Sequence, residues 1–158
     1  MNSIIVLVGR ILLAAIFILA GASKFADLTG TAGYFAMYNL PAPSVLAVIS
    51  GLVEVLGGIA VLIGFQTRIA AFGLAIFCVL TALIAHMDWA DLNQMIHFQK
   101  NLAMAGGFLV LGTYGPGTLS VDAQGRVRRE LDWVRIKDGA PTPLERMDNS
   151  ATTAAPTP

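Results

Sequence analysis

A carboxylate and a guanidinium both lie inside strongly apolar stretches of this sequence. Glu54 is near the middle of the run 44–65, and Arg10 lies within the run 4–20. About 20 such residues cross a bilayer, where an unpaired charge costs at least ~2.5–3.5 kcal/mol. We therefore expect an intramembrane ion pair between Arg10 and Glu54. Glu54 then either fixes helix register or acts as a catalytic carboxylate that handles protons.

Spacings of three and four residues place these groups on defined helix faces. The first face carries both cations of its run and consists of Arg10, Ala14, Phe17, Gly21 and Lys24. The second consists of Ser50, Glu54, Gly57 and Val61, with Gly51 and Gly58 beside it. Small residues let helices approach closely, so the glycines predict tight packing more than chemistry.

A second set of hydrogen-bonding groups follows the same spacing around residue 100. His97, Lys100 and Asn101 share a face, while Lys24 and His86 should lie at a similar depth on other helices. Together these groups predict a cationic, outward-facing pocket suited to a quinone carbonyl or a small anion. The alternative is that the lysines extend to lipid headgroups and the histidines lie in water.

Several kinds of site find no support in the sequence. His86 and His97 could in principle ligate a haem, but there is no cysteine attachment motif, and we expect no metal site and no covalently bound cofactor. No glycine-rich phosphate loop and no Ser-His-Asp set occurs. Ten basic and ten acidic residues give no net charge, which argues against nucleic acid as a partner. The single cysteine, Cys78, cannot form an intrachain disulfide.

The elements that must position these groups are membrane helices. With 56% hydrophobic and 13% charged residues in 158, the chain is typical of an integral membrane protein whose main partner is the lipid bilayer. Four runs have membrane length: 3–23, 44–65, 69–85 and 96–114. The aromatic segment 27–43 predicts a short interfacial helix, and Asp91 could cap a helix that begins near Leu92. The expected fold is an all-α, four-helix membrane bundle.

The basic residues predict the orientation of this bundle. Arg68 lies between the second and third runs, and six further cations follow the fourth: Arg126, Arg128, Arg129, Arg135, Lys137 and Arg146. The positive-inside rule then places both termini in the cytoplasm. We expect a membrane domain over 1–118, an amphipathic or hairpin segment over 119–138 with a turn at Gln124-Gly125, and a disordered cytoplasmic tail over 139–158.

Short motifs in the expected order resemble those of the DoxX family of small bacterial inner-membrane proteins. They are an early Arg10, the sequence GASKF at 21–25, EVLGG at 54–58 and KNLA at 100–103. The resemblance covers roughly 6–122 and implies a four-span, multi-pass protein of the bacterial inner membrane. Some members of that family are subunits associated with thiosulfate oxidation by quinone. The resemblance carries over no catalytic assignment, because a fold does not fix a reaction.

Two classes of function fit these residues. In the first, the chain is a quinone-linked redox subunit or a small membrane oxidoreductase component. Lys24, His97, Lys100 and Asn101 would hold the quinone, and a partner protein would supply electrons. In the second, it is a non-enzymatic assembly factor or small-solute carrier with a structural Arg10–Glu54 pair. The sequence does not decide whether the chain is an enzyme, and a homo-oligomer is compatible with either class.

Overall fold

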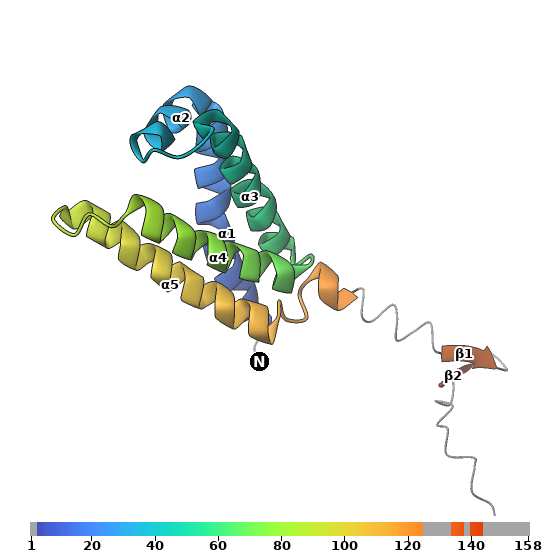
Figure 1. Ribbon diagram of the computed structural model, residues 1–158. Helices are drawn as coiled ribbons and strands as arrows, with labels where there is room; N and C mark the ends of the chain where they lie inside the picture. Colours follow the sequence, from blue (N-terminus) through green and yellow to red (C-terminus); the bar gives the residue numbers. More distant parts are fainter. Residues whose placement is uncertain (1–2, 125–133, 138–139, 144–158) are drawn as a thin grey trace, which may run out of the picture. The chain divides into compact units, whose positions relative to one another are not determined.

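The computed structural model describes residues 3–124, 134–137 and 140–143 (Figure 1). The chain divides into two compact units, with the boundary after Gln124. The first unit is all-α, as the sequence predicted. Its main helices are α1 (Ser3–Ala26), α2 (Leu28–Met37), α3 (Pro43–Ile63), α4 (Thr67–Ala85) and α5 (Leu92–Tyr114).

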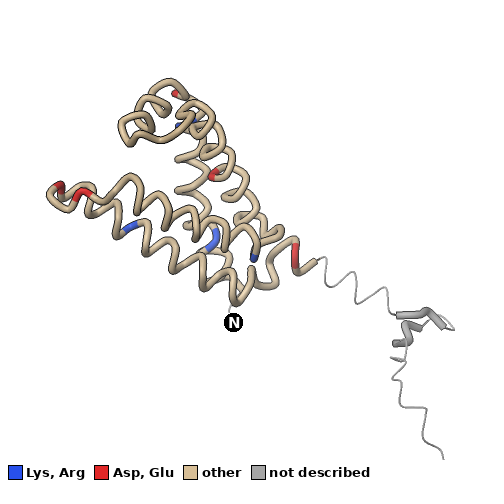
Figure 2. Tube along the Cα trace, viewed as in Figure 1, with Lys and Arg blue, Asp and Glu red and all other residues tan. Residues whose placement is uncertain are grey.

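Three of these helices, α1, α3 and α4, are long and apolar enough to cross a membrane. α5 has 23 residues, but its first turns are polar. It packs lengthwise and antiparallel against α4 (Figure 1). Charged residues are sparse along the helices (Figure 2). Capping of α5 follows the prediction, because the Asp91 side chain accepts a hydrogen bond from the Asn93 amide at 2.8 Å.

The helices form two pairs, α1 with α3 and α4 with α5, and α2 packs on α3. In Figure 1 the pairs lie close together where α3 turns into α4 and diverge toward α2 and the α4–α5 loop. Three aromatic rings join the pairs in the core. The ring centroid of Phe17 lies 5.2 Å from that of Phe108 and 6.5 Å from that of Phe77, both edge to face.

Close approach of α1 and α3 depends on glycine, as their faces predicted. A Cβ on Gly21 would lie 2.8 Å from the Gly51 carbonyl oxygen, and one on Gly58 would lie 2.8 Å from Ile18. Neither position has room for a larger side chain. The buried residues of α1 are Arg10, Ala14, Phe17 and Gly21, which are four of the five members of the predicted face.

A set of hydrogen bonds, here called the clasp, closes the end where the pairs meet. The Arg10 guanidinium donates to the carbonyls of Val61, Leu62, Pro116 and Leu119, three of them at 2.7–3.0 Å. Val61 and Leu62 lie in the last turn of α3, where carbonyls lack partners within the helix. The Asp122 carboxylate accepts from the amides of Gln66 and Thr67 and from the Thr67 hydroxyl, and so caps α4.

The clasp explains why the helical unit runs to Gln124, whereas the sequence placed its boundary at 118. Residues 121–124 form a helical turn, and the second residue of the predicted Gln124-Gly125 turn lies outside the described residues. A hairpin occurs later, as antiparallel strands β1 (Val134–Lys137) and β2 (Ala140–Pro143). β2 falls in the segment expected to be disordered. Its two prolines are tolerated because each strand of a two-stranded sheet has a free edge.

Candidate functional site

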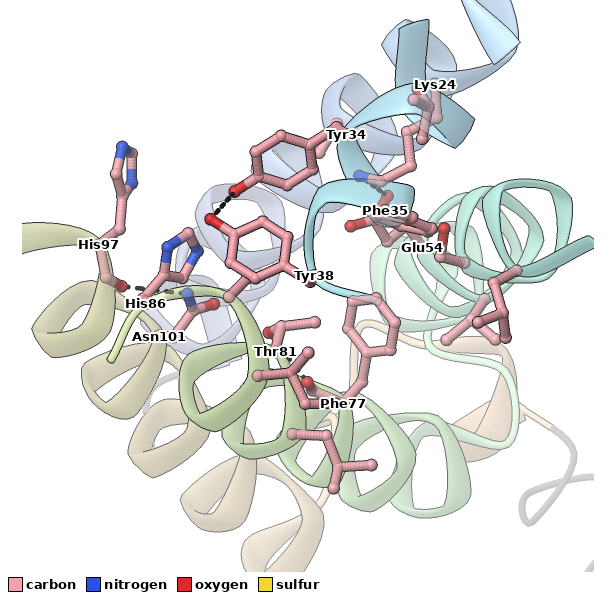
Figure 3. A pocket seen from close by; sticks show the side chains of 18 of the residues that line it. Lys24, Tyr34, Phe35, Tyr38, Glu54, Phe77, Thr81, His86, His97 and Asn101 are labelled. Carbon is pink, nitrogen blue, oxygen red and sulfur yellow. Dashed lines mark hydrogen bonds and ion pairs between the residues drawn. The ribbon is translucent and has the colours of Figure 1, made fainter. Parts of the chain in front are cut away.

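A cleft of about 980 Å³ lies between the two helix pairs, at the end away from the clasp (Figure 3). All five helices contribute to it. Its walls are mainly apolar, from residues such as Ile16, Phe17, Val53, Phe77 and Met104. The predicted binding residues Lys24, His97, Lys100 and Asn101 line this one cleft, and so do Glu54 and His86. The sequence could group them because each falls on the inner face of its helix.

Glu54 pairs with Lys24 rather than with Arg10. The distance from Lys24 Nζ to Glu54 Oε2 is 2.7 Å, and the two side chains are 21% and 8% exposed. The predicted Arg10–Glu54 ion pair is therefore wrong. In the antiparallel α1–α3 pair, Arg10 lies opposite Val61, seven residues or ~10 Å along α3 from Glu54. The unpaired carbonyls at the end of α3 are nearer acceptors, and Arg10 belongs to the clasp.

The Lys24–Glu54 pair leaves one carboxylate oxygen available. Within residues 3–124, Glu54 Oε1 accepts no hydrogen bond, while Glu54 as a whole borders the cleft. A buried carboxylate beside a lysine can exchange a proton with a bound ligand or with water in the cleft. The position of Glu54, midway along a spanning helix, makes this the most deeply placed titratable carboxyl of the cleft.

A polar cluster on α4 and α5 forms another part of the cleft wall (Figure 3). The His86 and His97 rings stack, with centroids 5.2 Å apart. Gln94 Oε1 lies 2.6 Å from His86 Nδ1, and Lys100 Nζ lies 3.0 Å from His97 Nδ1. Asn101 is 9% exposed and donates through Nδ2 to the His97 carbonyl at 3.0 Å. Sequence reasoning missed Gln94, which lies three residues before His97 on the same helix face.

Two tyrosines, one on α2 and one at its C-cap, also line the cleft, in a segment for which the sequence predicted only an interfacial helix. The hydroxyls of Tyr34 and Tyr38 are 3.1 Å apart, and their rings meet edge to face at 5.1 Å. Burial and the hydrogen bond with Tyr38 raise the pKa of Tyr34 to about 12. Asp27 is the N-cap of α2, and its side chain accepts a hydrogen bond from the Gly30 amide at 2.8 Å.

The arrangement suits an amphipathic ligand with a flat or elongated apolar body. Apolar walls can bury that body, while the polar groups that border them offer several donors and acceptors. No group of three or more His, Cys, Asp or Glu residues in the described parts of the chain could hold a metal ion. Cys78 is buried on α4.

Comparison with known proteins places this sequence in a family. The family model named DoxX matches residues 5–87. The chain is 42% identical over 117 residues to the inner membrane protein YqjF of Escherichia coli (strain K12), covering 74% of this chain and 88% of that protein. It is 36% identical over 125 residues to the inner membrane protein YphA of the same strain, covering 75% and 89%.

A third relative comes from another bacterium. The membrane protein Rv3486 of Mycobacterium tuberculosis (strain ATCC 25618 / H37Rv) is 34% identical over 125 residues, covering 72% of this chain and 76% of that protein. No solved structure matches the chain. The matched family model includes Arg10, Lys24 and Glu54 and ends before α5. With more than half of its length matched by the family model, this chain belongs to the DoxX family.

Proposed function

We propose that this protein binds an isoprenoid quinone in the cleft and serves as a subunit of quinone-linked redox metabolism in the bacterial inner membrane. The observation that carries the proposal is the union, in one cleft, of apolar walls with polar groups from every helix. An isoprenoid quinone has an apolar ring and tail and two carbonyl acceptors. It reaches such a cleft from the bilayer without crossing water.

The polar groups have the chemistry that this ligand needs. Reduction of a quinone to its quinol takes up two electrons and two protons. Lys100 is exposed to the cleft and forms no ion pair with a described carboxylate, so its ammonium group can donate to a carbonyl oxygen. Glu54, with its Oε1 available, is the proton-handling group in this proposal. The electrons come from a redox partner protein, and the subunit supplies binding and protons.

Orientation is part of the same proposal. The relatives YqjF and YphA are inner membrane proteins by name, which favours that membrane for this chain. With α5 counted as a span, the helical unit crosses the bilayer an even number of times. The basic residues that follow α5 then put both termini in the cytoplasm. The wide end of the cleft faces the outer half of the membrane.

The first test measures quinone that copurifies with the protein in mild detergent. Wild type should carry near-stoichiometric isoprenoid quinone, and Lys100→Ala should lose most of it. Gln99→Ala is the matched control, because Gln99 is an exposed residue of α5 that does not line the cleft. Equal background amounts in all three proteins would refute quinone binding at Lys100 and favour a solute-carrier or assembly role.

A second comparison separates proton handling from stability. Glu54→Gln should leave the amount of bound quinone and the protein abundance near wild-type levels. The rate of quinone reduction, measured in native membranes that contain the protein, should fall. If Glu54→Gln instead lowers abundance and preserves turnover per molecule, the carboxylate is structural and its catalytic assignment fails.

A further inference from the structure

The two histidines of the cleft have different hydrogen-bond partners on the same ring atom. Gln94 Oε1, an amide oxygen, lies 2.6 Å from His86 Nδ1. Lys100 Nζ, an ammonium nitrogen, lies 3.0 Å from His97 Nδ1. An amide oxygen can only accept a hydrogen bond, and an ammonium group can only donate one. The Nδ1 atom of His86 must therefore carry a proton, and that of His97 must carry a lone pair.

These partners set opposite tautomers on the two neutral rings. In His86 the proton on Nδ1 leaves Nε2 as an acceptor. In His97 the lone pair on Nδ1 leaves Nε2–H as a donor. The two rings stack with their centroids 5.2 Å apart, and the Lys100 ammonium lies beside His97. Neither Nε2 makes a hydrogen bond within the described helical unit, and both rings line the cleft.

We infer that His86 and His97 form a subsite that selects a ligand hydroxyl over a carbonyl, so that the cleft binds the quinol form more tightly than the quinone form. The inference rests on the proposed function. A quinol hydroxyl can donate to His86 Nε2 and can accept from His97 Nε2–H, so it suits both rings. A quinone carbonyl can only accept, so it leaves the His86 lone pair desolvated and unpaired.

The same geometry gives the residues that hold the rings a definite role. Gln94 and Lys100 act as positioning residues, because each fixes the tautomer of one histidine from its Nδ1 side. The role resembles that of the groups that orient metal-bound or catalytic histidines, where the partner of one ring nitrogen decides what the other nitrogen can do. Loss of Gln94 should affect His86 alone, and loss of Lys100 should affect His97.

The tautomers can be measured without any quinone. The chain contains two histidines, so 15N-histidine labelling of protein with a histidine-free tag gives two ring systems, and His86→Asn assigns them. Long-range 15N–1H correlation spectra in detergent should show His86 protonated on Nδ1 and His97 on Nε2. Gln94→Leu should remove the fixed tautomer of His86 and leave His97 unchanged. The same tautomer on both rings, or exchange on either, would overturn the inference.

Selectivity is then measured by anaerobic titration with decylubiquinone and its quinol. Wild type and the control Gln99→Leu should bind the quinol at least about tenfold more tightly than the quinone, and Gln94→Leu should bring the ratio near one. Equal affinities in wild type would overturn the hydroxyl selectivity while leaving quinone binding intact. Failure of both ligands to bind would refute the proposed function and this selectivity together. The 15N–1H correlation spectra would still test the two tautomers independently.

Discussion

Lys24 Nζ lies 2.7 Å from Glu54 Oε2, so the last turn of α1 is tied to the middle of α3 on the wall of the cleft. The two partners differ in burial, since the Lys24 side chain is 21% exposed and that of Glu54 is 8% exposed. This difference makes the pair asymmetric. A lysine left alone can reach water through the cleft, whereas a carboxylate left alone stays mostly covered.

We therefore expect Lys24→Met to destabilise the protein more than Glu54→Gln. Lys24→Met leaves a buried carboxylate without its partner and should cost about 1–3 kcal/mol of unfolding free energy. Glu54→Gln should cost less, and the double variant should recover part of the loss. Reversible SDS titration in mixed micelles measures all three free energies. Equal losses for the two single variants would contradict this account of the pair.

The clasp predicts where the chain can be shortened. A truncation after Gln124 keeps the Leu119 carbonyl and the Asp122 carboxylate, and should unfold like wild type. A truncation after Gly115 removes two acceptors of Arg10 and the cap of α4, and should cost at least about 3 kcal/mol, at about 1 kcal/mol per hydrogen bond.

A point substitution gives the clasp test its control. Asp122→Ala removes the cap of α4 but keeps all four carbonyl acceptors of Arg10, so it should cost about 1–2 kcal/mol, less than the longer truncation. Thermal unfolding in the same detergent compares the three proteins. If the two truncations melt at the same temperature, the segment between them does not close the bundle.

Tyr34 should titrate above the ordinary range of a tyrosine. Its pKa is raised to about 12 by burial and by the hydrogen bond with Tyr38, so the folded state favours the neutral phenol. The stabilisation from Tyr34 is present below about pH 10 and is lost as the pH rises toward 12. Tyrosinate absorbance should show a phase near pH 12 that Tyr34→Phe abolishes. Tyr114→Phe, at an exposed position of α5, should keep that phase.

Single cysteines test the orientation. Cys78 is 0% exposed, so the unmodified chain should react little with a membrane-impermeant maleimide. Thr29→Cys on α2 should be labelled from outside intact spheroplasts. Arg68→Cys, which is exposed at the start of α4, should be labelled only after lysis. The reverse pattern would invert the proposed topology, and labelling of both from outside would exclude it.

Much of the fold can be predicted from the sequence, because membrane helices and their buried faces depend on residues that are close together in the chain. The length of the apolar runs sets the helices, and three- and four-residue spacing sets their buried faces. Both rules worked for α1, whose buried residues all belong to the predicted face. The Asp91 cap of α5 was also predictable, because a cap depends on a few consecutive residues.

The second unit marks a limit of local reasoning. Composition around residue 140 favours disorder, yet 140–143 pairs with 134–137 as an antiparallel strand. Pairing between strands is a relation between two segments, and the preference of either segment alone does not reveal it. The same holds for the turn of chain after α5, whose contacts with Arg10 and with the start of α4 join residues more than 50 positions apart.

By itself, the sequence determined that this is a helical membrane protein, which residues face inward and which polar groups could meet in one pocket. Only the tertiary structure decided the partners. Periodicity gives the direction in which a side chain points, but the register of α1 against α3 decides which charge lies opposite Glu54. In the observed register, Arg10 lies at the carbonyls at the end of α3, and Lys24 lies at the Glu54 carboxylate. The divergence of the two helix pairs then made the cleft.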